Sequence, residues 1–184
     1  MKNVLKLCLP FLLFMSCNAD NKEAAVMEDT STAMMAETPA KPAPAVILDM
    51  SMSVPFKKSL EAFAAKDIDG FAAIFDDNVR FTWSGGDSLI GKQAIKDYYT
   101  GRFKIIDSIS YSDYIFLPVQ VNEAQSQYAQ TGKWMLYWAF AHAKYKNGKK
   151  LDFWVHQVNH LNDAGKVDYA GQYVDRGKIM ATSK

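Results

Sequence analysis

The chain has 184 residues, of which 49% are hydrophobic and 13% aromatic. This length predicts one domain with extensions, and the apolar content can bury a core in a domain of roughly 130 residues. Basic and acidic residues number 21 and 20, which gives a formal net charge of +1. Because no basic stripe is present, a nucleic-acid partner has no electrostatic support. No run of about 20 apolar residues occurs, so no transmembrane helix is expected.

The two cysteines, Cys8 and Cys17, both lie within the first 17 residues. The folded part of the chain therefore has no cysteine for a disulfide, a thiolate metal site or a catalytic nucleophile.

Residues 1–16 are typical of an export signal. Two lysines accompany an almost wholly apolar segment from Leu7 to Met15, which is too short to span a membrane but fits the core of a signal peptide. The segment ends in Phe14-Met15-Ser16-Cys17, which resembles a lipobox, the site where lipoprotein signal peptidase cuts before a cysteine that becomes lipid-modified. This resemblance implies a lipid at Cys17 that anchors the protein in the cell envelope, in the outer membrane of a Gram-negative bacterium. An ordinary signal peptide followed by an incidental cysteine is the alternative.

Residues 17–50 predict a lipidated cysteine followed by a flexible tether. This stretch is rich in Ala, Glu, Thr, Met and Pro, with Pro39, Pro42 and Pro44 close together, and it shows no sustained hydrophobic period. Its length suits holding a domain away from a membrane surface. The folded domain is therefore expected over residues 51–184.

Three helices are predicted at the front of this domain. Ser53 can cap the first helix, and Pro55 fits its first turn. Asp67 can cap a second, short helix, and Gly91 precedes the third. The apolar residues recur at helical spacing: Phe56, Leu60 and Phe63 in the first; Ile68, Phe71, Ile74 and Phe75 in the second; Ile95, Tyr98, Tyr99 and Ile106 in the third.

Strands dominate the rest. Residues 79–84 alternate cleanly between the second and third helices, after a break at Asp76-Asp77-Asn78. Four further strands are predicted over residues 109–121, 134–145, 151–161 and 167–175, separated by polar loops and turns. Pro118 suggests an edge position or a bulge in the first of these. Helices followed by an antiparallel meander predict an α+β fold in which helices cover one face of a curved sheet. Such a cone leaves a natural small-molecule pocket.

Three stretches carry a resemblance to a known family. These are residues 60–67 running into 75–81, residues 90–95, and residues 163–167 followed by 173–175. Over residues 54–179 the chain is similar to the nuclear-transport-factor-two-like superfamily, in its SnoaL-like branch. The resemblance implies a cone-like α+β barrel, with three N-terminal helices packed on a curved, mostly antiparallel sheet.

That fold serves isomerases, dehydratases, epoxide hydrolases, cyclases, binding domains and association domains, so it does not settle the function. The favoured interpretation is an envelope-anchored module that binds a small, largely apolar molecule or mediates protein association, with a homodimer formed through the sheet. The alternative is an enzyme of the isomerase or dehydratase kind that uses a His/Asp acid–base pair.

His156, Asp175 and Tyr173 are the candidate catalytic residues. A mid-strand imidazole oriented by Asp175 could abstract a proton next to a carbonyl, while Tyr173 positions the substrate. Two alternatives stay open: His156 lies on the outer sheet face or in a dimer interface, and Asp175 caps a backbone turn. His156 and His160 lie about 13 Å apart on one strand face, too far to chelate one ion alone, so neither a metal nor a cofactor is expected.

Trp83, Tyr98, Trp138 and Tyr169 are the candidate ligand-pocket residues. Aromatic side chains dominate the walls of pockets for hydrophobic ligands. They also dominate cores and dimer interfaces, which is the alternative for each of the four. Period-two alternation shows which residues share a face of the sheet, but it does not show which face is inward.

Overall fold

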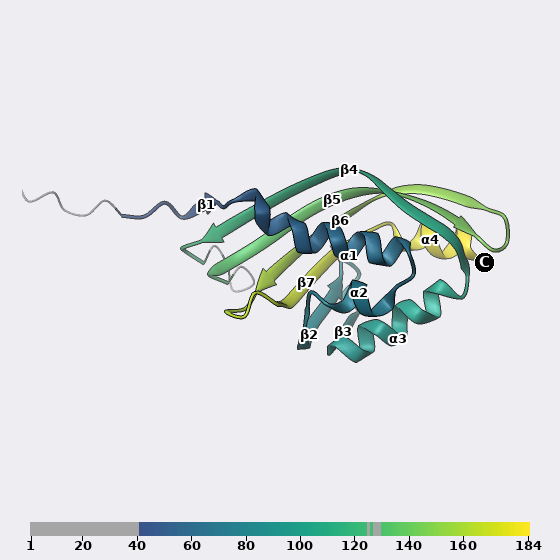
Figure 1. The fold of residues 1–184 in the computed structure, drawn as a ribbon, viewed down its shortest axis with the longest axis horizontal. Coiled ribbons are helices and arrows are strands. Elements are labelled where there is room, and N and C mark those ends of the chain that lie inside the picture. Colours follow the sequence, from purple (N-terminus) through teal and green to yellow (C-terminus); the bar gives the residue numbers. More distant parts are fainter. Residues whose placement is uncertain (1–40, 125, 127–129) are drawn as a thin grey trace, which may run out of the picture. The chain divides into compact units, whose positions relative to one another are not determined.

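The computed structural model describes residues 41–184, except for residue 125 and residues 127–129. The predicted signal peptide, the lipid site at Cys17 and most of the predicted tether lie outside the described residues. Residues 41–184 have a mixed α+β fold (Figure 1). The sheet is curved, as predicted, but it does not close on itself. The predicted fold class is confirmed.

The three predicted helices form, although the second and third end earlier than predicted, and two helices are added, one before the first and one at the C-terminus. The side chain of Asp67 caps the second helix by accepting from the backbone N–H of Gly70. Ser53 does not cap the first, because its hydroxyl donates to the carbonyl of Met50 instead. Gly91 precedes the third helix with φ of 88°, a conformation that favours glycine. The helices are η1 (Met50–Ser53), α1 (Val54–Ala64), α2 (Ile68–Ala72), α3 (Lys92–Phe103) and α4 (Arg176–Ser183).

The strands form one seven-stranded sheet in the order β1-β4-β5-β6-β7-β2-β3. All neighbours pair antiparallel except β2 and β7, which are parallel. A bulge between Ser112 and Ile115, with Asp113 at φ of 50°, interrupts the register of the longest strand. The strands are β1 (Ala45–Ile47), β2 (Phe75–Trp83), β3 (Ser88–Ile90), β4 (Ile106–Val121), β5 (Gly132–Tyr145), β6 (Lys150–Leu161) and β7 (Val167–Tyr173).

Several elements differ from the sequence predictions, and β3 and η1 were not predicted at all. β1 lies within the predicted tether and pairs with β4, so the ordered unit begins before residue 51. β2 continues through the predicted break, because Asp77 pairs with Lys92 and Asp76 accepts from Asn162, which satisfies both carboxylates beside the strand. The last strand ends at residue 173, and a helix, α4, follows it.

The long strands have two distinct faces. On β5 the residues from Met135 to Tyr145 in steps of two are buried and form the inner face, which belongs to the core. Phe63 of α1 stands at the centre of this core, with its ring edge-on to those of Phe71 and Tyr99. Residues in the alternate register, such as Trp138, form the outer face. Inner-face residues and side chains of α1, α2 and α3 are therefore in one core.

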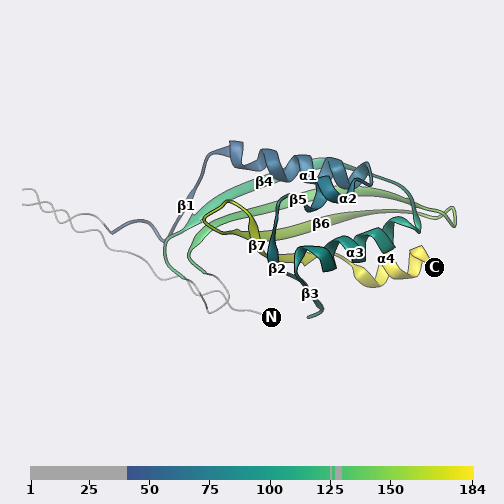
Figure 2. The same cartoon turned by 60° about the horizontal axis from the view of Figure 1, so that its bottom comes forward.

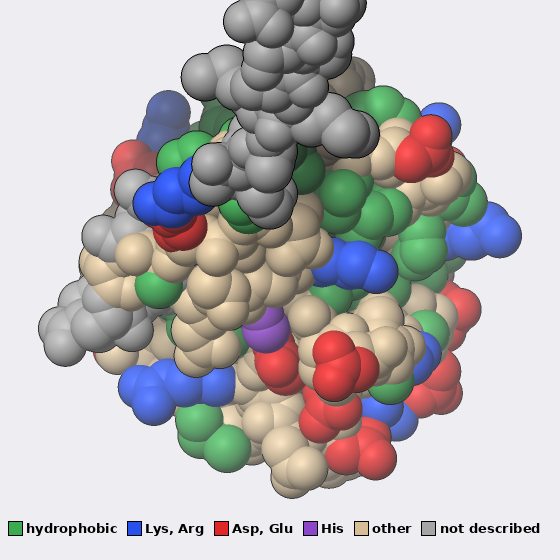
Figure 3. All heavy atoms as spheres, turned by 90° about the vertical axis from the view of Figure 1, so that its left-hand side faces the viewer, with side chains coloured by type: hydrophobic (Ala, Val, Ile, Leu, Met, Phe, Trp, Pro, Cys, Tyr) green, Lys and Arg blue, Asp and Glu red, His purple; other side chains and the backbone are tan. Residues whose placement is uncertain are grey.

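The C-terminal helix, α4, is attached to the turn between β5 and β6. The amide of Asn147, in the β5–β6 turn, donates to the carbonyl of Thr182 in α4 at 2.9 Å. In Figure 2, α3 and α4 run close to each other, and the hydrogen bond from Arg102 to Met180 joins them. Seen from the opposite end, basic side chains are spread over the face and are not gathered in one patch, while most acidic side chains lie toward the lower right (Figure 3).

Candidate functional site

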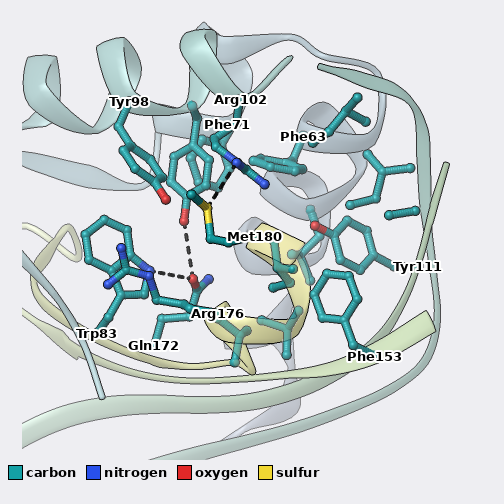
Figure 4. A pocket seen from close by; sticks show the side chains of 18 of the residues that line it. Phe63, Phe71, Trp83, Tyr98, Arg102, Tyr111, Phe153, Gln172, Arg176 and Met180 are labelled. Atoms are coloured by element: carbon teal, nitrogen blue, oxygen red, sulfur yellow. Dashed lines mark hydrogen bonds between the residues drawn. The ribbon is translucent and has the colours of Figure 1, made fainter. Parts of the chain in front are cut away.

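A cavity of about 90 Å³ lies between the helices and the inner face of the sheet. A water molecule needs about 10–15 Å³ on this scale, so the cavity has room for a small organic group. Aromatic rings form one side, with Phe63, Tyr111 and Phe153 close together (Figure 4). The lining residues are Leu60, Phe63, Phe71, Trp83, Tyr98, Tyr99, Arg102, Ile106, Ile109, Tyr111, Tyr137, Ala143, Tyr145, Phe153, Val155, Gln172, Val174, Arg176, Ile179 and Met180.

The helical spacing on α3 and the register of the strands explain why these side chains line one cavity. Tyr98 and Arg102 are four residues apart on α3, so they share one face of the helix. Tyr137 on β5 lies opposite Gln157 on β6, which lies opposite Gln172 on β7, so all three project from the same face of the sheet. Ala143 is the small inner-face residue of β5 that lines the cavity. Its short side chain leaves part of the space unfilled.

A chain of three amide side chains, of which Gln157 and Asn159 are buried and Gln172 is half-buried, orders the polar part of the wall. The side-chain oxygen of Gln172 accepts from the indole of Trp83 at 3.0 Å and from the hydroxyl of Tyr99 at 3.3 Å. The amide of Gln172 donates to the side-chain oxygen of Gln157 at 3.2 Å, which also accepts from Tyr137 at 3.0 Å. Gln157 in turn donates to Asn159. Because this network pairs polar groups with one another, it fixes the aromatic rings in place.

The buried tyrosines are hydrogen-bond donors and not bases. Burial is the main reason that the pKa values of Tyr99, Tyr111 and Tyr137 lie well above the ordinary value for a phenol. Their hydroxyls therefore stay protonated at neutral pH. None of the residues lining the cavity in the described part of the chain is Asp, Glu, His, Lys or Cys.

Two arginines face the cavity, and their surroundings differ. Arg176 at the start of α4 pairs with Asp87, and its guanidinium lies 4.7 Å from the ring centroid of Trp83. The hydrogen bond to Asp87 is the main reason that the pKa of Arg176 is raised. Arg102 comes from the last turn of α3 and points toward the middle of the cavity, where its Nη1 lies 3.6 Å from the sulfur of Met180 (Figure 4).

Of the four predicted pocket residues, the structure brings two to the cavity. Trp83 and Tyr98 line it. Trp138 does not, because its position on β5 alternates with Tyr137 and so faces outward. Tyr169 does not either: it lies opposite His160 in the outer register, and its ring centroid lies 6.2 Å from that of Trp134.

The three candidate catalytic residues do not form a group at the cavity. His156 stacks between Trp138 and Tyr173 on the outer face, with ring centroids 4.3 and 5.5 Å away, and its Nδ1 lies 3.0 Å from the backbone oxygen of Tyr137. Asp175 caps α4 by accepting from the backbone N–H of Lys178 at 2.9 Å. These placements match the two alternatives left open by the sequence, so the predicted acid–base group in the pocket is corrected.

A serine, a histidine and an aspartate are hydrogen-bonded in series on the outer face. His142 Nε2 lies 3.0 Å from the hydroxyl of Ser112, and Nδ1 lies 3.1 Å from Asp152. The Ser112 hydroxyl donates to Asp113, so its proton is not directed at the imidazole. The side chains of His142 and Asp152 are 42% and 60% exposed. This is a solvated network, without the dry surroundings that activate a nucleophile.

No group of three or more metal-ligating side chains occurs among the described residues. Within the same residues, no helix has the length and hydropathy needed to cross a membrane.

Sequence reasoning missed four polar or soft side chains of the cavity. Arg102 carries a detectable signal, because it lies at helical spacing from Tyr98. Gln172 shares its strand with the candidates Tyr169 and Tyr173 but alternates with them. Arg176 and Met180 could not be found, because α4 itself was not predicted.

A family model for the SnoaL-like domain matches residues 56–169. The chain belongs to the SnoaL-like domain family. No curated protein matched the sequence.

Solved structures agree on the fold of this SnoaL-like protein. An NTF2-like protein of unknown function from Burkholderia pseudomallei has a TM-score of 0.56 at 14% identity, covering 74% of this chain and 99% of that one. A protein assigned as a polyketide cyclase from Pseudomonas putida has a TM-score of 0.57 at 14% identity, with 73% and 98% covered. An LEH-like epoxide hydrolase from M. tuberculosis has a TM-score of 0.51 at 14% identity, with 71% and 87% covered. At these identities the likeness shows the fold alone.

Proposed function

We propose that this SnoaL-like domain binds a small, largely apolar molecule in the cavity between its helices and its sheet. The observation that carries the proposal is an unfilled space walled by aromatic rings, with a fixed set of polar groups at one side. Pockets for small molecules combine an apolar lining with a few oriented polar groups in this way. The amide network holds the rings in place before the ligand arrives, which lowers the entropic cost of binding.

Binding is better supported than catalysis. Solved proteins of the same fold include one assigned as a polyketide cyclase and an LEH-like epoxide hydrolase. An isomerase or dehydratase needs a proton acceptor near the substrate. The described lining offers tyrosines held neutral by burial, and His156 and Asp175 lie elsewhere. The enzyme alternative therefore lacks a base on the surface that would contact a substrate.

The direct test is calorimetric titration of the full chain with a single-ring amphipathic probe, the neutral amide 4-phenylbutyramide. We expect saturable binding of one molecule per chain. Native mass spectrometry of the protein as purified is expected to show a bound apolar molecule. Absence of saturable binding, together with a mass that corresponds to the bare polypeptide, would contradict the proposal.

We also propose that the domain is held in the cell envelope by a lipid at Cys17, as its lipobox resemblance implies. Cys17→Ser is expected to abolish incorporation of a labelled fatty acid in a Gram-negative host. It should also move nearly all of the protein out of the membrane fraction, because stable anchoring depends on the acyl chains. Cys8→Ser is the matched control and should leave both labelling and fractionation unchanged. Equal labelling of both variants would mean that Cys17 is not the lipid site.

The outer face of the sheet favours a second role in association with another copy of the chain. Ile115, Trp154 and Tyr173 are 54%, 47% and 49% exposed. Trp138 and His156 lie between Ile115 and Tyr173 in the strand register. Contiguous apolar surface of this kind marks protein contacts. We expect sedimentation of the full chain to give twice the monomer mass, and Trp154→Asp to reduce it to the monomer. Ile90→Asp, at an exposed apolar site on β3, should leave the dimer intact; a monomeric wild type would contradict this role.

A further inference from the structure

Arg102 is the cavity's least satisfied charged group. An arginine side chain is positively charged at any ordinary pH and presents five N–H donors. Its contacts are the thioether of Met180 at 3.6 Å and the hydroxyl of Tyr145, which are neutral acceptors, and sulfur is a weak one. Among the described residues, no carboxylate lies within 4.0 Å of its side-chain nitrogens. The C-terminus of α3 supplies only partial negative charge.

Arg176, which lines the same cavity, has a carboxylate partner. Its guanidinium is paired with Asp87, and it lies over the face of Trp83. The two arginines line one space, yet the protein supplies a carboxylate to only one of them. The unmatched guanidinium is directed into the aromatic part of the cavity (Figure 4).

We propose that the ligand of this cavity is an amphipathic monocarboxylic acid whose carboxylate binds Arg102. The guanidinium fork matches a carboxylate and can form two parallel N–H···O bonds with it. One unpaired arginine neutralises one negative charge, which fits a carboxylate better than a phosphate with a charge near −2. The apolar body of the acid then lies against Phe63, Tyr111 and Phe153. This inference rests on the proposed binding function and names the ligand class.

The geometry also gives α4 a part in recognition. Met180 lies beside the Arg102 guanidinium and belongs to α4, which is attached to the rest of the domain by the Asp175 cap and the Asn147 hydrogen bond. A carboxylate at Arg102 would take the place of the weak sulfur contact. The acid group therefore lies at the α4 end of the cavity, and the ring lies deeper.

The test compares 4-phenylbutyrate with its neutral amide on the full chain by isothermal titration calorimetry. The wild type is expected to bind the acid about tenfold or more tightly than the amide, because a hydrogen bond to a charged group is worth more than one between neutral groups. Arg102→Met should bring the affinity for the acid down to the variant's own affinity for the amide. Arg102→Lys should keep part of the preference. Lys104→Met, which removes an exposed charge just beyond α3, is the control and should keep all of it.

The outcomes separate this inference from the function on which it rests. Equal affinity of the wild type for acid and amide, or an undiminished preference in Arg102→Met, would overturn the assignment of the acid to Arg102. Binding of neither probe would contradict the proposed function itself. Cooperative unfolding of Arg102→Met in urea shows that the variant is folded, so loss of the preference then reports the missing guanidinium.

Discussion

Ala143→Phe is expected to abolish binding of 4-phenylbutyramide, with an affinity at least about 100-fold below that of the wild type. Ala143 is a buried inner-face residue of β5 that lines the cavity. A benzyl group at this position would occupy the space that the ligand needs, and an aromatic ligand cannot enter a site that another ring fills. Titration calorimetry of the full chain measures the loss. Overpacking of a core site costs typically about 1–3 kcal/mol, so the variant should still unfold cooperatively in urea.

Substitutions of increasing size at Ala143 test whether loss of cavity volume causes the loss of binding. Ala143→Val and Ala143→Leu should weaken binding progressively, because each leaves less free volume. Ala164→Phe places the same ring in the exposed β6–β7 turn and should leave the affinity unchanged. If Ala143→Phe is folded and binds the amide as the wild type does, the ligand does not occupy the cavity. The outer face of the sheet would then be the remaining candidate binding site.

Most of the fold follows from local patterns. The apolar spacing of α1 and the alternation in the second half of β2 are strong because each element has one buried side. The N-terminal strand, β1, has no such signal: all three of its residues are exposed, and only pairing with β4 orders them. The helix α4 has no fully buried residue, and tertiary contacts such as that from Asn147 to Thr182 hold it in place. Elements stabilised by contacts distant in sequence carry little local signal.

The candidate site was harder to predict because both faces of β5 are apolar. The outer register carries Leu136, Trp138 and Phe140, which are larger than the inner-face alanines. Trp138 was selected for its aromatic ring, and alternation alone could not show that its register faces outward; the histidine and tyrosine stacked in line with it share its placement. The inner register of β5 mixes large residues with alanines, and Ala143 is the alanine that leaves room at the cavity. Trp83 and Tyr98 were selected on the same aromatic criterion as Trp138, and the structure places them at the cavity because their sides of β2 and α3 face the core.

The free energy of unfolding is expected to fall steeply above about pH 10, by about 4 kcal/mol per pH unit from three tyrosines. Burial raises the pKa values of Tyr99, Tyr111 and Tyr137 in the folded state above the ordinary value near 10. Below that pH both states keep these protons, so the three groups contribute their full stabilisation. Above it the unfolded chain loses them while the folded chain retains them, and each tyrosine then costs about 1.4 kcal/mol per pH unit.

Urea unfolding at a series of pH values, followed by circular dichroism, measures this slope. Tyr99→Phe should reduce the slope by about a third, because it removes one of three titrating hydroxyls and leaves the Gln172 oxygen its bond from Trp83. Tyr173→Phe, which removes an exposed hydroxyl from the outer face, serves as the control and should leave the slope as it is. A slope smaller than that for a single tyrosine would mean that water reaches these hydroxyls. The cavity would then be a wetted cleft, and the apolar binding site inferred from its walls would lose its physical basis.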